Sequence, residues 1–70
     1  MLRQEAIALL KELGDRQLIQ PFSVIIEKQT KDKFQLKIRG SYDLNQIESF
    51  LKKRGFTYEN SKEYLIIFKQ

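Results

Sequence analysis

The chain has 70 residues, of which 41% are hydrophobic and 31% charged, so we expect one small globular domain over residues 1–70 and exclude intrinsic disorder. It contains neither cysteine nor histidine, which excludes disulfides, the usual zinc sites and histidine-based catalysis. The net charge of +4 favours an acidic partner.

The first predicted element is an amphipathic helix. Leucine and alanine recur at positions 2, 6, 9, 10 and 13, which is the spacing of one helical face. Gly14 follows the last apolar position, and we expect it to end this helix as a left-handed cap residue. Pro21 biases the residue before it toward an extended backbone, so any further helical turn ends there.

A β-hairpin is predicted next, with strands at 22–29 and 33–39. Apolar residues occupy positions 22, 24 and 26 of the first strand and 34, 36 and 38 of the second, as expected for strands with one buried face. Opposed residues share a face of the sheet. We therefore expect a three-residue loop at 30–32, which sets Ile26 opposite Leu36.

The second predicted helix has sequence signals at both ends. Asp43 and Gln46 have the spacing of an N-terminal capping box. Gly55 stands where a left-handed cap residue is expected, and Phe56 can fold back on Leu51 in a Schellman motif. Positive charge in the last turn complements the helix dipole. The basic residues of that turn are Lys52, Lys53 and Arg54.

A second hairpin is predicted at the end of the chain, with strands at 56–59 and 63–69 and a turn near residues 60–62. Its last strand is apolar on both faces, which is typical of a central strand or of a contact surface. The expected inner face consists of Tyr64, Ile66 and Phe68, and the expected outer face of Leu65 and Ile67.

The order of elements is therefore α-β-β-α-β-β, which predicts the α+β class. We expect one four-stranded antiparallel sheet with two helices packed on one face, because each apolar helix stripe needs a sheet surface to cover it. The apolar runs are far too short to span a bilayer and no signal peptide is visible, so we expect a cytoplasmic protein without a membrane partner.

Catalytic machinery is not expected. Without histidine or cysteine, no base of the usual kind can activate a serine. Asp32 and Asp43 have turn and capping roles, and no group of carboxylates has the spacing of a metal site. No glycine-rich phosphate loop occurs. We expect a non-enzymatic protein with no metal and no other cofactor.

The basic residues favour a binding module for nucleic acid or an acidic protein. Three basic residues of the second strand share its outer face, on which successive positions are about 7 Å apart, and this spacing suits contacts with phosphates. The same pattern also serves to keep a strand soluble. Aromatic residues are expected on the inner face, which favours backbone contacts over base stacking. The candidate residues are Lys33, Lys37 and Arg39 on the strand and Lys52, Lys53 and Arg54 on the helix.

The alternative function is a protein-interaction module or a homodimer. Ile25, Leu65 and Ile67 are expected on the outer face, where they either meet a partner or cover one another. A chain this short buries a small core, and self-association would add to its thin stability margin.

Overall fold

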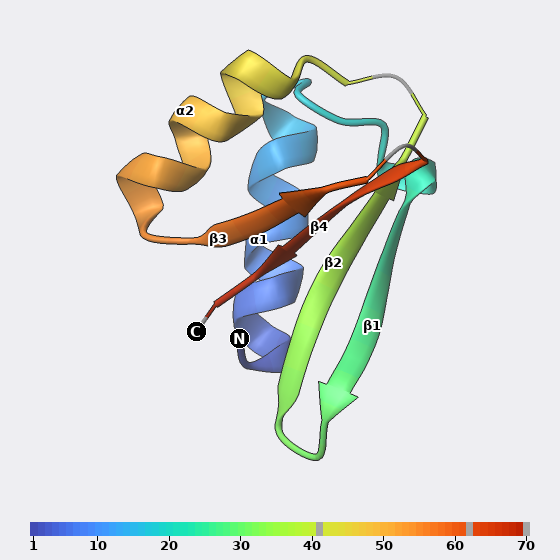
Figure 1. Cartoon of the computed structure of the whole chain (residues 1–70), viewed down its shortest axis with the longest axis vertical. Helices are drawn as coiled ribbons and strands as arrows, with labels where there is room; N and C mark the ends of the chain where they lie inside the picture. Colours follow the sequence, from blue (N-terminus) through green and yellow to red (C-terminus); the bar gives the residue numbers. More distant parts are fainter. Residues whose placement is uncertain (41, 62, 70) are drawn as a thin grey trace.

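The computed structural model describes residues 1–40, 42–61 and 63–69. Its elements are the helix α1 (Arg3–Asp15), a short 3₁₀ turn η1 (Pro21–Ser23), the strands β1 (Val24–Thr30) and β2 (Lys33–Arg39), the helix α2 (Leu44–Arg54), and the strands β3 (Thr57–Asn60) and β4 (Tyr64–Phe68) (Figure 1). The strands form one four-stranded antiparallel sheet in the order β1-β2-β4-β3. The predicted α+β class and element order are confirmed.

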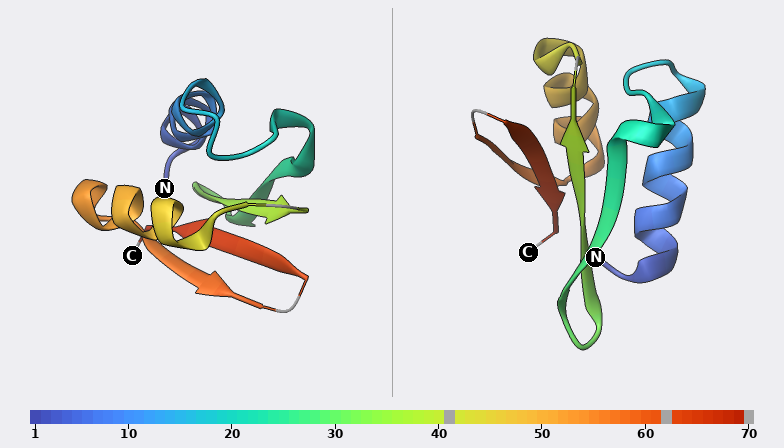
Figure 2. Two further views of the ribbon diagram at one scale, coloured as in Figure 1. Left: turned by 90° about the horizontal axis from the view of Figure 1, so that it is seen from above. Right: turned by 90° about the vertical axis from the view of Figure 1, so that its right-hand side faces the viewer.

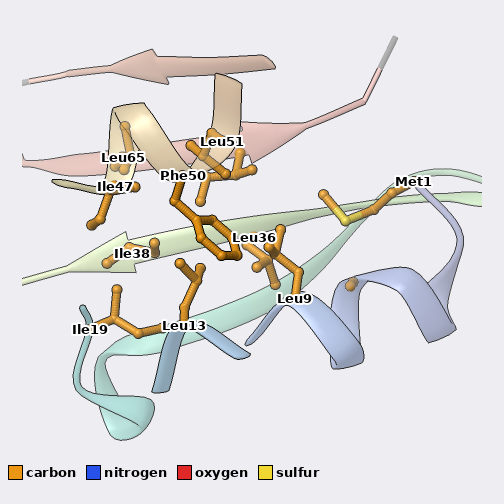
Figure 3. Packing of buried hydrophobic residues seen from close by; sticks show 12 residues of the cluster. Met1, Leu9, Leu13, Ile19, Leu36, Ile38, Ile47, Phe50, Leu51 and Leu65 are labelled. Atoms are coloured by element: carbon orange, nitrogen blue, oxygen red, sulfur yellow. The ribbon is translucent and has the colours of Figure 1, made fainter. Parts of the chain in front are cut away.

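Both helices lie on the same side of the twisted sheet (Figure 2). α1 packs against β1 and β2, and α2 packs beside β3. Their apolar stripes meet the inner faces of β2 and β4 in a single core (Figure 3). No polar or charged side chain of the described residues is buried there. The largest fully buried side chains are Leu13, Leu36, Ile38, Ile47, Leu51, Leu65 and Ile67.

The end of α1 differs from the prediction. The helix continues through Gly14, and Gln17 adopts the left-handed conformation with φ 59°. The Leu18 N–H donates to the Leu13 carbonyl at 3.0 Å, and the Gln17 N–H donates to the Gly14 carbonyl at 3.0 Å. These two bonds form a Schellman motif. It lies three residues later than predicted because Leu18, at the end of the motif, packs against the core.

α2 has the predicted N-cap residue and ends as predicted, but of the predicted capping box only the bonds to the Asp43 side chain are found among the described residues. The Asp43 carboxylate accepts the backbone N–H groups of Asn45 at 3.0 Å and Gln46 at 3.3 Å. At the other end, Gly55 has φ 76° and the Phe56 N–H donates to the carbonyl of Leu51 at 3.0 Å. The bond between Phe56 and Leu51 closes the predicted Schellman motif, so both helices end in the same way.

The first hairpin has the predicted register and a different turn. Ile26 lies opposite Leu36 as expected. The turn itself consists of two residues, Lys31 and Asp32, and the ladder has a β-bulge at Gln29. The bulge inserts one extra residue into β1 and thereby keeps apolar residues of both strands on one face.

The start of this hairpin is shorter than predicted. β1 begins at Val24, because the preceding residues form η1 instead of extended strand. Phe22, expected on the inner face, is 85% exposed in that turn. Its side chain therefore adds nothing to the core.

The faces of β4 are the reverse of the prediction. Leu65 lies opposite Ile38 and Ile67 lies opposite Leu36, and both β4 residues have 0% exposure. Their neighbours Tyr64, Ile66 and Phe68 therefore point away from the helices. A strand that is apolar on both faces does not fix its own orientation, so pairing with β2 decides it. Lys62, in the predicted turn before β4, lies outside the described residues.

The tip of the β1–β2 hairpin projects beyond the rest of the sheet along the longest axis (Figure 1). β4 pairs with β2 only from Leu36 onward. Beyond that point the Phe34 N–H donates to the Met1 carbonyl at 2.7 Å. Residues 28–33 are all exposed, so the tip is held by its own ladder and turn.

Candidate nucleic-acid interface

No helix of the described residues covers the sheet face opposite α1 and α2 (Figure 2). Strand alternation places residues of all four strands there, and its central row runs from Ile25 through Lys37 and Ile66 to Glu59. We call this surface the open face. Its residues are Ile25 and Glu27 of β1, Gln35, Lys37 and Arg39 of β2, Tyr64, Ile66 and Phe68 of β4, and Thr57 and Glu59 of β3.

Lys37 lies across the middle of the open face and is held by two neighbours. Its ammonium nitrogen is 3.5 Å from the Glu27 Oε1 atom and 4.1 Å from the centroid of the Tyr64 ring. Its side chain is only 24% exposed. A cation over an aromatic ring is attracted by the ring quadrupole. Lys37 therefore fixes the Tyr64 ring, and part of its charge is already neutralised.

The other two members of the predicted basic row are more accessible. Lys33 and Arg39 lie at opposite ends of β2 and are both exposed. None of the ion pairs found among residues 1–40, 42–61 and 63–69 involves either of them. Arg39 lies opposite Tyr64 in the ladder. These two side chains can therefore donate to an anionic ligand without first breaking a contact in the described part of the chain.

Two aromatic side chains lie on the open face, where the sequence analysis expected none. Tyr64 and Phe68 both belong to the outward set of β4 and are half-buried among their neighbours. The expectation that aromatic residues are confined to the inner face is wrong for this strand. The reason is again the orientation of β4, which its own residue pattern leaves open.

Tyr58, in contrast, lies on the inner side of β3, opposite Ile67. Tyr58 therefore lies on the face where the sequence analysis expected aromatic residues, and Tyr64 does not. A hydrogen bond from its hydroxyl group lowers the pKa of the Glu48 carboxyl below 4.5, with help from Lys52. The same bond raises the pKa of Tyr58 above 10.0. The pair ties α2 to β3 and is no part of the open face.

The basic residues at the end of α2 form a separate group, because α2 covers the other face of the sheet. Lys52 lies 3.4 Å from Glu48. Arg54 pairs with Glu12 of α1 and lies 4.9 Å from the centroid of the Phe50 ring. The six predicted phosphate ligands therefore do not form one surface: Lys33, Lys37 and Arg39 lie on one side of the sheet, and Lys52, Lys53 and Arg54 on the other.

The predicted apolar patch is wrong in two of its three members. Ile25 is 50% exposed on the open face, whereas Leu65 and Ile67 are buried in the core. Ile66 takes their place, since it lies in the same row as Ile25 with Lys37 between them. No sequence signal distinguishes Ile66 from its two neighbours, because all three are aliphatic.

The described residues contain no group of three or more acidic, histidine or cysteine side chains that could hold a metal ion. Within the same part of the chain, no helix is long and apolar enough to cross a membrane.

Comparison with known proteins gave no match, neither to a family model, nor to a curated protein, nor to a solved structure. The class of ligand is therefore inferred from the side chains of the open face.

Proposed function

We propose that this protein is a non-enzymatic module that binds single-stranded nucleic acid on the open face of its sheet. The observation that supports this function is the presence of Tyr64 and Phe68 beside the cations of β2, on a face that no helix covers. Proteins that bind single strands combine aromatic side chains, on which bases stack, with a basic surface that follows the phosphates.

The phosphates would follow β2 and the hairpin tip. Lys33 and Arg39 are exposed at the two ends of β2, and Lys31 in the turn extends the basic surface beyond the sheet. Glu27 lies on the β1 side and would repel a phosphate there. The nucleic acid would therefore run over the central strands β2 and β4.

The bases would contact β4. Tyr64 and Phe68 are about 13 Å apart along the strand, since they are four positions apart. Stacking on one aromatic side chain contributes about 1–3 kcal/mol per base. Nothing on this face is arranged to read base edges, so sequence preference should be slight.

The test compares a mixed-sequence single-stranded oligonucleotide with the corresponding duplex at several salt concentrations. We expect tighter binding to the single strand, and an affinity that falls with salt because phosphate contacts release counterions. Arg39→Glu and Phe68→Ala should each weaken binding and leave the circular dichroism spectrum unchanged. Lys11→Glu is the matched control, since it makes the same charge change as Arg39→Glu at an exposed position of α1. Equal binding by Arg39→Glu and the parent, or no binding by the parent at low salt, would contradict the proposal.

A second candidate function is protein interaction or homodimerisation through the same face. It is favoured by Ile25, which is 50% exposed, and by Ile66 in the same row. An apolar centre with a charged rim is the usual arrangement of a protein interface. Because one face cannot serve a dimer and a nucleic acid at once, the oligomeric state separates the two functions.

A further inference from the structure

A groove lies between α2 and the segment that follows α1, on the side of the sheet opposite the open face. Its volume is about 750 Å³. It adjoins a second hollow of about 900 Å³, with which it shares Leu18, Asn45 and Gln46. Pockets for small ligands usually have about 300–1,000 Å³. The groove is therefore large enough for a molecule of metabolite size.

Basic side chains gather at one end of this groove. Arg16, Lys53 and Arg54 line it, and no carboxylate belongs to the lining among the residues that the structure describes. Arg16 follows α1, whereas the other two end α2. Only the tertiary fold, with the Arg54–Glu12 ion pair between the two helices, brings them together, which is why the sequence indicated a single basic triplet.

The two arginine side chains are held in place before any ligand arrives. The guanidinium groups lie 5.2 Å (Arg16) and 4.9 Å (Arg54) from the centroid of the Phe50 ring. Both also pair with the same oxygen atom of Glu12, Arg16 at 3.6 Å and Arg54 in closer contact. Contacts with a ring and a carboxylate reduce the side-chain entropy that an arginine loses when it binds a ligand.

The charge at this end is not balanced. Of the three positive side chains, Arg16 and Arg54 share the carboxylate of Glu12 and Lys53 has no ion pair among the described residues, which leaves two positive charges. A phosphate monoester carries about −1.5 to −2 charges at neutral pH and accepts several hydrogen bonds. Arginine suits phosphate because its planar N–H groups bind two oxygen atoms at once. A carboxylate ligand would leave one positive charge unpaired.

The part of the groove away from the three basic side chains is lined by neutral polar side chains. Ser49, Asn45 and Gln46 line it with neutral groups that can donate and accept hydrogen bonds. Beyond the shared residues, Gln17 and Gln20 line the adjoining hollow. Such a surface suits the uncharged polar part of a ligand whose phosphate lies at the basic end.

We propose that this groove binds a small phosphorylated molecule, with its phosphate group between Arg16, Lys53 and Arg54 and its polar remainder along Asn45 and Gln46. This site is independent of the proposed nucleic-acid interface, since it lies on the opposite side of the sheet and shares no residue with the open face.

The test is a titration followed by NMR at constant ionic strength, with inorganic phosphate, adenosine monophosphate and adenosine as probes. Phosphate and adenosine monophosphate should shift the amide signals of Ser49 and Lys53, and adenosine should not. Lys53→Gln should weaken binding of adenosine monophosphate about tenfold, the effect of losing one charge-assisted contact. Lys52→Gln is the matched control, because Lys52 pairs with Glu48 and does not line the groove.

Three results would overturn the proposal. They are unchanged amide signals of Ser49 and Lys53 at millimolar phosphate or adenosine monophosphate, an equal loss of affinity in the two lysine variants, and shifts centred on Tyr64 and Phe68. The last result would place the nucleotide on the open face. Failure of the oligonucleotide experiment would not affect this site, because inorganic phosphate and the Lys53 variant test the groove alone.

Discussion

Gly55 and Gln17 are the left-handed residues of the two Schellman motifs, Gly55 at the end of α2 and Gln17 at the end of α1. Each adopts a left-handed backbone, with φ 76° and φ 59° respectively. Glycine reaches this conformation without steric cost, whereas a residue with a Cβ atom loses about 1–2 kcal/mol. The Schellman motif that ends α1 therefore contains Gln17, a residue for which the left-handed backbone conformation is unfavourable. The bonds of Leu18 and its contact with the core must offset that cost.

This comparison gives a paired prediction for stability. Gly55→Ala should lower the free energy of unfolding by about 1–2 kcal/mol, because no atom lies within 4 Å of the added Cβ and only the backbone conformation opposes it. Gln17→Gly should raise the free energy of unfolding by up to about 1 kcal/mol, since it removes the same strain. Urea unfolding of both variants measures the two effects. A Gly55→Ala protein as stable as the parent would show that Gly55 does not need its left-handed conformation.

β4 is the element whose orientation determines both the core and the open face. Its inward residues, Leu65 and Ile67, fill the space between β2 and the helices, and its outward residues supply the aromatic groups of the proposed interface. A shift of one residue in its pairing would exchange the two sets completely. The proposed function therefore depends on the register of this strand.

The orientation of β4 can be tested with two neighbouring substitutions. Leu65→Ala should lower the free energy of unfolding by about 2–5 kcal/mol, as for a fully buried leucine. Ile66→Ala should cost clearly less, because Ile66 is only partly buried on the open face. Thermal unfolding followed by circular dichroism gives both values. A larger loss for Ile66→Ala than for Leu65→Ala would contradict the register described here and would restore the orientation predicted from the sequence.

At the scale of the whole molecule, one sheet separates two surfaces of different chemistry. The helices close the core on one side, and the other side is open (Figure 2). On the helix side, a basic groove lies between α2 and the segment that follows α1. A chain of 70 residues buries a limited core, so an uncovered sheet face is a substantial share of its surface. A ligand or a second copy of the chain on that face would stabilise the fold by mass action.

The proposed function requires that the open face is free in the unbound protein. We therefore expect a monomer mass at micromolar concentrations and a melting temperature that does not change with protein concentration. Analytical ultracentrifugation and melting curves at several concentrations measure both. A melting temperature that rises with concentration in the parent but not in Ile66→Lys would contradict this expectation, and would favour the homodimer that uses Ile25 and Ile66.

Three features could be predicted from the sequence alone: the order of elements, the limits of α2 and the register of the first hairpin. Each of these depends on interactions within a few residues or on a clear alternation. Asp43 and Gly55 bond to their own helix, and the even-numbered apolar residues of β1 and β2 admit one pairing parity.

Three other features became known only from the fold: the orientation of β4, the true end of α1 and the proximity of Arg16 to Arg54. These features depend on contacts between residues far apart in the chain, and their local patterns fit more than one arrangement. Leu65, Ile66 and Ile67 are interchangeable as a pattern, and the pairing with β2 selects which of them are buried. The open face and the groove both result from that long-range packing. Which faces of the helices and strands are buried, and which are left exposed, is decided only when these elements pack together in one core.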